Sequence, residues 1–231
     1  MTSTVQIDLS EAERVTAAVY PATPEKRAGI RLVLAHGAGT NQSHPVMVRC
    51  ATGLASRGID TVTFNFAYSE ARRRVPDRTG KLEACYAQVI RAAQAGRFGS
   101  AEMPLAIGGR SMGGRIATHL AAQEAADTYG IAALVLLGYP LHPPGQPEKL
   151  RAQHLPAIRV PLLFVQGSRD AFGTPDELRP VLRPLKGLAE LHVVEGADHS
   201  HKVPKKLAPQ EAVEAAIFDR IATWLRERVG A

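Results

Sequence analysis

The chain has 231 residues, of which 45% are hydrophobic and 22% are charged, and this composition excludes a disordered or low-complexity protein. No apolar run approaches the roughly 18 residues needed to span a bilayer, and the N-terminus lacks the pattern of a signal peptide. We therefore expect a cytoplasmic protein without a membrane partner. The formal net charge of +6 is spread along the chain without a nucleic-acid-binding motif, so we also expect no nucleic-acid partner.

Apolar runs that predict strands alternate with amphipathic segments that predict helices along the chain. The predicted strands are an edge strand at residues 14–20 and further strands at 30–35, 61–66, 105–108, 132–137, 162–166 and 191–195. The predicted helices span residues 45–56, 81–95, 112–126, 148–153, 175–182 and 210–228. Because such alternation is typical of parallel sheets covered on both faces, we expect a single α/β domain over residues 1–231, built as a three-layer α/β/α sandwich with a mostly parallel sheet.

Two further features of the sequence limit what the domain can contain. Only about two dozen residues, rich in proline, separate the strand at 132–137 from the strand at 162–166, which leaves no room for a large lid. Cys50 and Cys85 fall in predicted helices and lack metal-ligand spacing. We expect both to be buried reduced thiols, and we expect no metal site.

The most informative motif is the G-x-S-x-G formed by Gly109, Ser111 and Gly113 between a predicted strand and a predicted helix. A sharp strand-to-helix turn of this kind exposes the serine oxygen in a strained backbone conformation. Side chains at the two glycine positions would collide with the neighbouring strand or helix. The motif therefore predicts a nucleophilic Ser111, with a helix N-cap serine as the alternative.

A serine nucleophile needs a base and a group that orients the base. Asp170 follows the predicted strand at 162–166, and His199 follows the strand at 191–195. Because the carboxyl ends of parallel strands share one edge of the sheet, we expect Ser111, Asp170 and His199 to meet there as nucleophile, acid and base.

Other titratable residues compete for these roles. Asp176 and Glu177 are alternatives to Asp170 as the acid. His201 and His192 are alternatives to His199, but His192 is expected to be fixed in a strand and His201 to enter the following loop or helix. Asp198 is adjacent in sequence to the base that it would have to face, so we interpret it as a turn residue.

The predicted strand at 30–35 runs into a turn that contains glycine, residues 36–40. Acyl transfer requires N–H donors directed at the developing oxyanion. The N–H groups of Ala38 and Met112 are our candidates for an oxyanion hole, with a plain tight turn as the alternative reading of the loop. We expect a structural role for His36.

Several residues are candidates for contact with a substrate. Arg110 and Arg115 flank the serine, and a run of three arginines lies earlier in the chain, at residues 72–74. Either group could bind a carboxylate or phosphate, with a solvated loop as the alternative for the run. Three further residues that follow predicted strands could line a pocket, although they could equally pack the loops: Tyr139, His142 and Phe172.

As a whole the chain resembles the α/β-hydrolase superfamily, and within it small bacterial serine hydrolases related to dienelactone hydrolase and a hydrolase-like domain found in a subunit of a eukaryotic chromatin-modifying assembly. The resemblance lies in the segments His36-Gly-Ala-Gly, Phe64-Asn-Phe, Gly109-Arg-Ser-Met-Gly-Gly-Arg, Gly138-Tyr-Pro-Leu-His-Pro-Pro-Gly, Gln166-Gly-Ser-Arg-Asp and Gly196-Ala-Asp-His-Ser. It implies an α/β-hydrolase fold and the same triad. Dienelactone hydrolases use a cysteine nucleophile, so the serine argues against that particular activity.

Taken together, the motifs predict a serine hydrolase, a carboxylesterase acting on a small or medium ester or thioester through an acyl-enzyme. No metal or organic cofactor is implied, and the expected partner is a small-molecule acyl substrate. The alternative is a non-catalytic interaction or scaffold domain that retains the hydrolase fold. The sequence leaves the oligomeric state and the acyl preference open.

Overall fold

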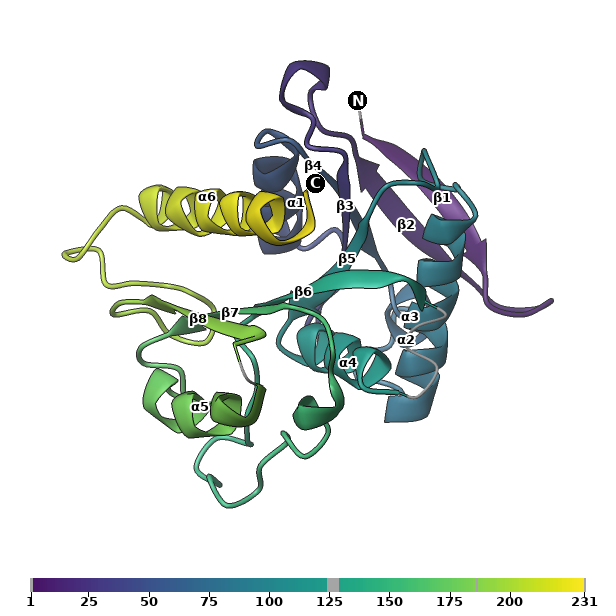
Figure 1. Cartoon of the computed structure of the whole chain (residues 1–231). Coiled ribbons are helices and arrows are strands. Elements are labelled where there is room, and N and C mark those ends of the chain that lie inside the picture. The colour runs from purple at the N-terminus through teal and green to yellow at the C-terminus, as the bar shows by residue number, and fades with distance from the viewer. Residues whose placement is uncertain (1, 124–128, 186, 231) are drawn as a thin grey trace.

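The computed structural model describes residues 2–123, 129–185 and 187–230 (Figure 1). Its strands form one eight-stranded sheet in the order β1-β2-β4-β3-β5-β6-β7-β8. The pairs β1/β2 and β2/β4 are antiparallel, and every pair from β4 to β8 is parallel. The bounds are β1 (Ser3–Asp8), β2 (Arg14–Tyr20), β3 (Ile30–Ala35), β4 (Ile59–Phe64), β5 (Leu105–Arg110), β6 (Ile131–Leu137), β7 (Leu162–Gly167) and β8 (Ala189–Val194).

Helices cover both faces of this sheet and make the three-layer sandwich that the sequence predicts. The helices lie at α1 (Pro45–Ala55), α2 (Ala67–Glu70), α3 (Thr79–Gln94), α4 (Met112–Ala121), α5 (Pro175–Leu182) and α6 (Gln210–Val229), with 3₁₀ turns η1 (Pro24–Lys26), η3 (Leu155–Ala157) and η4 (Arg183–Leu185). Figure 1 shows α1 and α6 on one face and α2 to α5 on the other. In the described part of the chain, no helix is long and apolar enough to cross a membrane.

The central strands are apolar on both sides because each side faces a layer of helices. In β3, all six residues are buried. Leu32 and Leu34 belong to the core beneath α1 and α6, whereas Val33 and Ala35 belong to the core beneath α3 and α4. Successive side chains of a strand point to opposite faces, so one short apolar run supplies both cores.

The strand order places a crevice at the carboxyl ends of β3 and β5. These two strands are neighbours, but the chain leaves β3 toward β4 and leaves β5 toward β6, in opposite directions along the sheet. The loops that follow β3 and β5 therefore diverge. Open α/β sheets bind their ligands at such a point, which directs attention to residues 36–44 and to Ser111.

The structure corrects the sequence predictions at four places. β2 is an interior strand, because it pairs with both β1 and β4, and β1 occupies the edge. The helix predicted at 148–153 is absent from the described residues, where turns lead instead into η3. The helix predicted at 112–126 ends at Ala121, and its positions 124–126 lie outside the described residues. The short helix α2 was not predicted.

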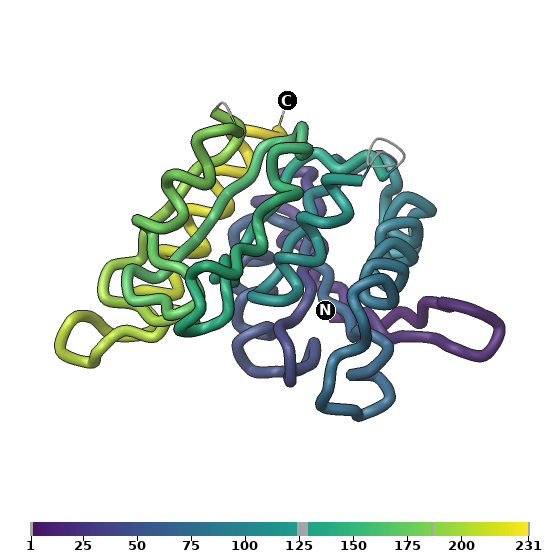
Figure 2. Tube along the Cα trace, turned by 90° about the horizontal axis from the view of Figure 1, so that it is seen from below, coloured from purple at the N-terminus to yellow at the C-terminus, as the bar shows by residue number. Residues whose placement is uncertain are grey.

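Figure 2, a view from below, shows the purple N-terminal hairpin of β1 and β2 extending from one side of the molecule. The two cysteines are buried and free, as the sequence predicts, Cys50 in α1 and Cys85 in α3. Burial raises the pKa of each thiol to about 12, so both stay protonated and unreactive at neutral pH.

Candidate active site

Ser111 occupies the turn between β5 and α4, as the motif predicts. Its φ of 47° and ψ of −117° lie outside the regions that L-residues favour. The glycines of the motif let the backbone of β3 approach closely. A Cβ atom would come within 2.4 Å of the Ala35 carbonyl oxygen at Gly109, and within 2.5 Å of the same oxygen at Gly113. The packing of α4 against β3 thus fixes the strained turn that presents the serine hydroxyl.

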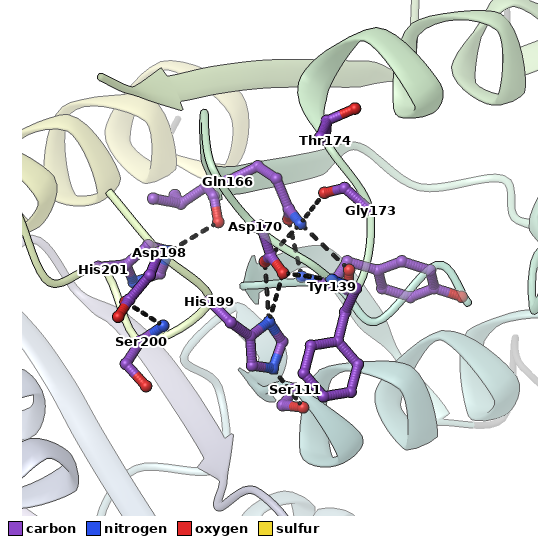
Figure 3. Close-up of polar contacts among 12 residues, drawn as sticks. Ser111, Tyr139, Gln166, Asp170, Gly173, Thr174, Asp198, His199, Ser200 and His201 are labelled. Atoms are coloured by element: carbon purple, nitrogen blue, oxygen red, sulfur yellow. Dashed lines mark hydrogen bonds and ion pairs between the residues drawn. The ribbon is translucent and has the colours of Figure 1, made fainter. Parts of the chain in front are cut away.

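The structure brings Ser111, His199 and Asp170 together from the ends of β5, β8 and β7 (Figure 3). His199 Nε2 lies 2.9 Å from Ser111 Oγ. His199 Nδ1 lies 2.8 Å from Oδ2 and 3.0 Å from Oδ1 of Asp170. Because the carboxylate accepts at Nδ1, that atom carries the proton, and Nε2 is left as an acceptor for the serine hydroxyl.

Asp170 is fully buried, and its carboxylate is held by neutral donors in addition to His199. The Phe172 N–H donates to Oδ1 at 2.8 Å, and the Gln166 side-chain amide donates to Oδ2 at 2.8 Å. These hydrogen bonds fix the position of the carboxylate beside the imidazole, and the Phe172 ring stacks on His199 with centroids 4.2 Å apart.

Gln166 is a site residue that the sequence reasoning did not single out. It is fully buried at the end of β7. Its Nε2 also donates to the carbonyls of Tyr139 and Gly173, at 3.2 and 2.8 Å, while its Oε1 accepts from the Tyr139 N–H at 2.8 Å. One amide thus ties the loops after β6 and β7 to Asp170 (Figure 3). The only signal in the sequence is a polar residue at the end of an apolar run.

The rival histidines and acids occupy other places. His201 is buried with Nε2 3.1 Å from the Val165 carbonyl, and burial lowers its pKa to about 4, so it is a neutral structural residue. His192 lies within β8. Asp198 accepts the N–H groups of residues 200 and 202 in a turn, as expected. Glu177 caps the start of α5.

The loop after β3 lies against the serine, where an oxyanion hole would have to be. Ala38 and Met112 both line the cavity that contains Ser111. Among the described residues, neither of their N–H groups has a protein acceptor. His36 is fully buried, with Nδ1 2.8 Å from the Gly37 carbonyl, and its Nε2 accepts the Phe66 N–H at 3.2 Å. Burial lowers the pKa of His36 to about 4, so a neutral imidazole braces this loop.

A cavity of about 650 Å³ opens above Ser111 and His199. Arg110 and Phe172 line it, as proposed from the sequence, and Arg115 does so as well. Tyr139 and His142 do not. Tyr139 is fully buried and donates its hydroxyl to the Arg151 carbonyl at 2.7 Å.

Two other proposed contacts also fall elsewhere in the structure. His142 is 4% exposed, and its Nε2 lies 3.3 Å from Glu177 Oε1. The arginines at 72–74 are exposed and lie outside the lining of the cavity. Tyr139 and His142 therefore support loops rather than contact a ligand. Within the described ranges, no group of three potential metal ligands is present.

A family model described as the alpha/beta hydrolase domain matches residues 28–226. The chain belongs to the alpha/beta hydrolase family. Solved structures of similar fold include an α/β serine hydrolase without a lid from Xanthomonas campestris, with 17% identity, 96% of this chain and 94% of that chain covered and a TM-score of 0.72. They also include an esterase domain from Rhodothermus marinus, with 16% identity, both chains fully covered and a TM-score of 0.72.

A dienelactone hydrolase from Anabaena variabilis is similar as well, with 17% identity and a TM-score of 0.74. The match covers 99% of this chain and 98% of that chain. At these identities the neighbours show that this hydrolase shares their fold. The chemistry must come from its own residues.

Proposed function

We propose that this hydrolase cleaves a carboxylic ester or thioester through a covalent acyl-enzyme. Ser111 is the nucleophile, His199 the general base and acid, and Asp170 the group that orients the imidazole and stabilises its protonated form. The observation that carries the proposal is the continuous hydrogen-bonded chain from Ser111 Oγ through both nitrogens of His199 to a buried carboxylate.

Each step follows from this arrangement. As Ser111 Oγ bonds to the carbonyl carbon, its proton passes to His199 Nε2. The former carbonyl oxygen becomes negatively charged and accepts hydrogen bonds from the N–H groups of Ala38 and Met112, the proposed oxyanion hole. The imidazolium then protonates the leaving alcohol or thiol as the bond to carbon breaks. A water molecule then attacks the acyl-enzyme carbonyl while it gives a proton to His199 Nε2. The imidazolium returns that proton to Ser111 Oγ as the bond from Oγ to carbon breaks, which releases the acid and free Ser111.

The main alternative is a non-catalytic domain that retains the fold. The strained serine, the aligned base and the buried acid favour catalysis over this alternative, because a binding domain has no need to keep a costly backbone conformation at Ser111. The structural neighbours include a serine hydrolase and an esterase domain, which point in the same direction.

The proposal is tested by labelling the purified protein with a fluorophosphonate probe and by measuring hydrolysis of 4-nitrophenyl butyrate. We expect labelling at Ser111, and a fall in kcat of about 10⁴-fold or more in both Ser111→Ala and His199→Ala, because the triad acts as a unit. Ser200→Ala is the matched control, since Ser200 is an exposed serine that lines the same cavity. A folded wild-type protein that takes up no label, or equal labelling of Ser111→Ala, would refute the proposal.

A further inference from the structure

The cavity above the proposed triad has an uneven charge. Four cationic side chains line it: Arg110, Arg115, Arg151 and Lys202. The acidic residue in its lining is Asp77, and the Arg73 guanidinium already lies 2.7 Å from that carboxylate. The cavity thus offers positive charge and almost no free negative charge to a ligand.

These four cations also lack partners within the protein. In the part of the chain that the structure describes, none of them forms an ion pair or a side-chain hydrogen bond. Some arginines outside the cavity are paired. Arg49 lies 2.8 Å from Glu214, and Arg57 lies 2.6 Å from Asp219. Among the described residues, exposed cations such as Arg74 and Arg169 also lack an ion pair, but water solvates them, whereas Arg110 and Arg115 are partly buried.

Within this group, Arg115 and Arg151 lie close enough to repel each other. Arg115 is half-buried, and its Nε is buried without a partner. Burial lowers the pKa of Arg115, and the positive charge of Arg151 lowers it further. Arg115 also lies in the first turn of α4, where the helix dipole already places partial positive charge. The repulsion between these two guanidinium groups, one of them in the first turn of α4, destabilises the empty cavity, and a bound anion would remove that cost.

Arg151 is held in place by the same network that supports Asp170. The Arg151 carbonyl accepts the Tyr139 hydroxyl at 2.7 Å, and the Arg151 N–H donates to the Leu141 carbonyl at 2.7 Å. The Tyr139 backbone is fixed in turn by Gln166. The loop that carries this guanidinium is therefore ordered relative to the proposed triad before a ligand arrives, as a specific binding site requires.

We propose that the substrate carries a carboxylate or phosphate group in addition to its ester or thioester bond, and that the guanidinium groups of Arg115 and Arg151 bind this anion. Planar guanidinium groups match both anions with paired hydrogen bonds. This inference rests on the proposed function, because it defines the substrate class of the same cavity. Arg110 and Lys202 add to the positive field that attracts such a substrate.

Two matched pairs of esters test the inference on both sides of the scissile bond. In the acyl pair the charge lies on the acyl group: the compounds are mono-4-nitrophenyl succinate and its methyl ester. In the alcohol pair the charge lies on the leaving group: the compounds are 4-acetoxybenzoic acid and its methyl ester. Within a pair, the two compounds differ by one negative charge. We expect kcat/KM to favour the acid by about 10- to 100-fold in at least one pair, as a charge-assisted contact implies.

The same preference is then measured in variants. We expect Arg115→Met and Arg151→Met each to lose most of the preference for the acid, while Arg74→Met, an exposed arginine outside the cavity, retains it. Inhibition of methyl-ester hydrolysis by inorganic phosphate or by acetate identifies the anion, since tighter inhibition by phosphate assigns a phosphate-bearing substrate and tighter inhibition by acetate a carboxylate-bearing one.

The outcomes separate this inference from the proposal on which it rests. Turnover of both methyl esters without preference for either acid, or a preference that survives in both Arg115→Met and Arg151→Met, overturns the anion site and leaves the esterase proposal intact. Absence of turnover of all four esters, together with absence of fluorophosphonate labelling at Ser111, overturns both.

Discussion

At the scale of single residues, the amide of Gln166 connects the parts of the site that the chain supplies separately. It holds the buried carboxylate of Asp170 and, through the backbone of Tyr139, the loop that carries Arg151. An uncharged donor suits this position, because a second carboxylate beside Asp170 would be repelled and a cation would draw Asp170 away from His199.

We therefore predict that Gln166→Met lowers kcat for a neutral ester by about tenfold, as removal of a positioning hydrogen bond implies. Without the Gln166 donor, the Asp170 carboxylate interacts more strongly with the protonated form of His199. The acidic limb of the pH–rate profile should therefore move to higher pH. Stopped assays from pH 5 to 9 measure both effects, with the exposed Gln153→Met as a control. An unchanged pH profile, even with lower activity, would reduce Gln166 to a purely structural role.

The meeting of Ser111, His199 and Asp170 could be predicted from the sequence, because each of them follows its own apolar run. Gln166 could not, because its importance comes from partners at positions 139 and 173 in other loops. Whether Tyr139 and His142 line the pocket or pack the loops could not be decided from the sequence for a related reason. A residue that follows a strand is near the site, but whether its side chain faces the cavity depends on loop packing.

At the scale of elements, the start of α5 matters for the site, because it follows Asp170 by only a short turn. Thr174 is the N-cap of α5 and forms a capping box with Glu177. Its hydroxyl accepts the Glu177 N–H at 3.4 Å, and Glu177 Oε2 accepts the Thr174 N–H at 2.7 Å. These hydrogen bonds lower the pKa of Glu177, so the cap holds best while that side chain is ionised.

Removal of this cap should destabilise the protein measurably. We predict that Thr174→Ala lowers the free energy of unfolding by about 1 kcal/mol, and that Thr174→Ser loses much less because it retains the hydroxyl. Urea unfolding at pH 7 measures the difference. Equal stability of the alanine and serine variants would mean that α5 is fixed by its buried residues Pro175 and Leu178 rather than by its cap.

Two of the incorrect element predictions, the missed strand β1 and the helix expected at 148–153, share one cause, the solvent exposure of the segments. β1 has only Ile7 buried, so it carries no continuous apolar run, and its pairing with β2 is what makes it a strand. Residues 148–153 have a helix-like pattern but bury little, apart from Ala152. Without an apolar face against the sheet, a short segment gains too little from packing to stay helical.

At the scale of the whole molecule, buried neutral histidines couple folding to pH. Burial lowers the pKa of both His36 and His201 from 6.5 to about 4. Between these values the unfolded chain binds protons that the folded chain does not. Their contribution to stability is therefore complete above pH 6.5 and is lost as the pH falls toward 4.

We predict that the free energy of unfolding at pH 5 is lower than at pH 7.5 by about 4 kcal/mol from these two residues, about 2 kcal/mol each. Urea unfolding at the two pH values measures the loss. His201→Gln should show about 2 kcal/mol less of it, whereas His44→Gln, at an exposed position, should match the wild type. A loss that is the same in His201→Gln and in the wild type would contradict this account.

The proposed nucleophile and the proposed base are 88 residues apart, and His199 follows the last strand of the sheet. During synthesis on the ribosome, Ser111 emerges long before His199, and the proposed base reaches it only after β8 has been added at the edge of the sheet. Until then Ser111 is an ordinary alcohol. On the proposed mechanism, we therefore expect a chain cut before His199 to keep Ser111 but to lose its esterase activity.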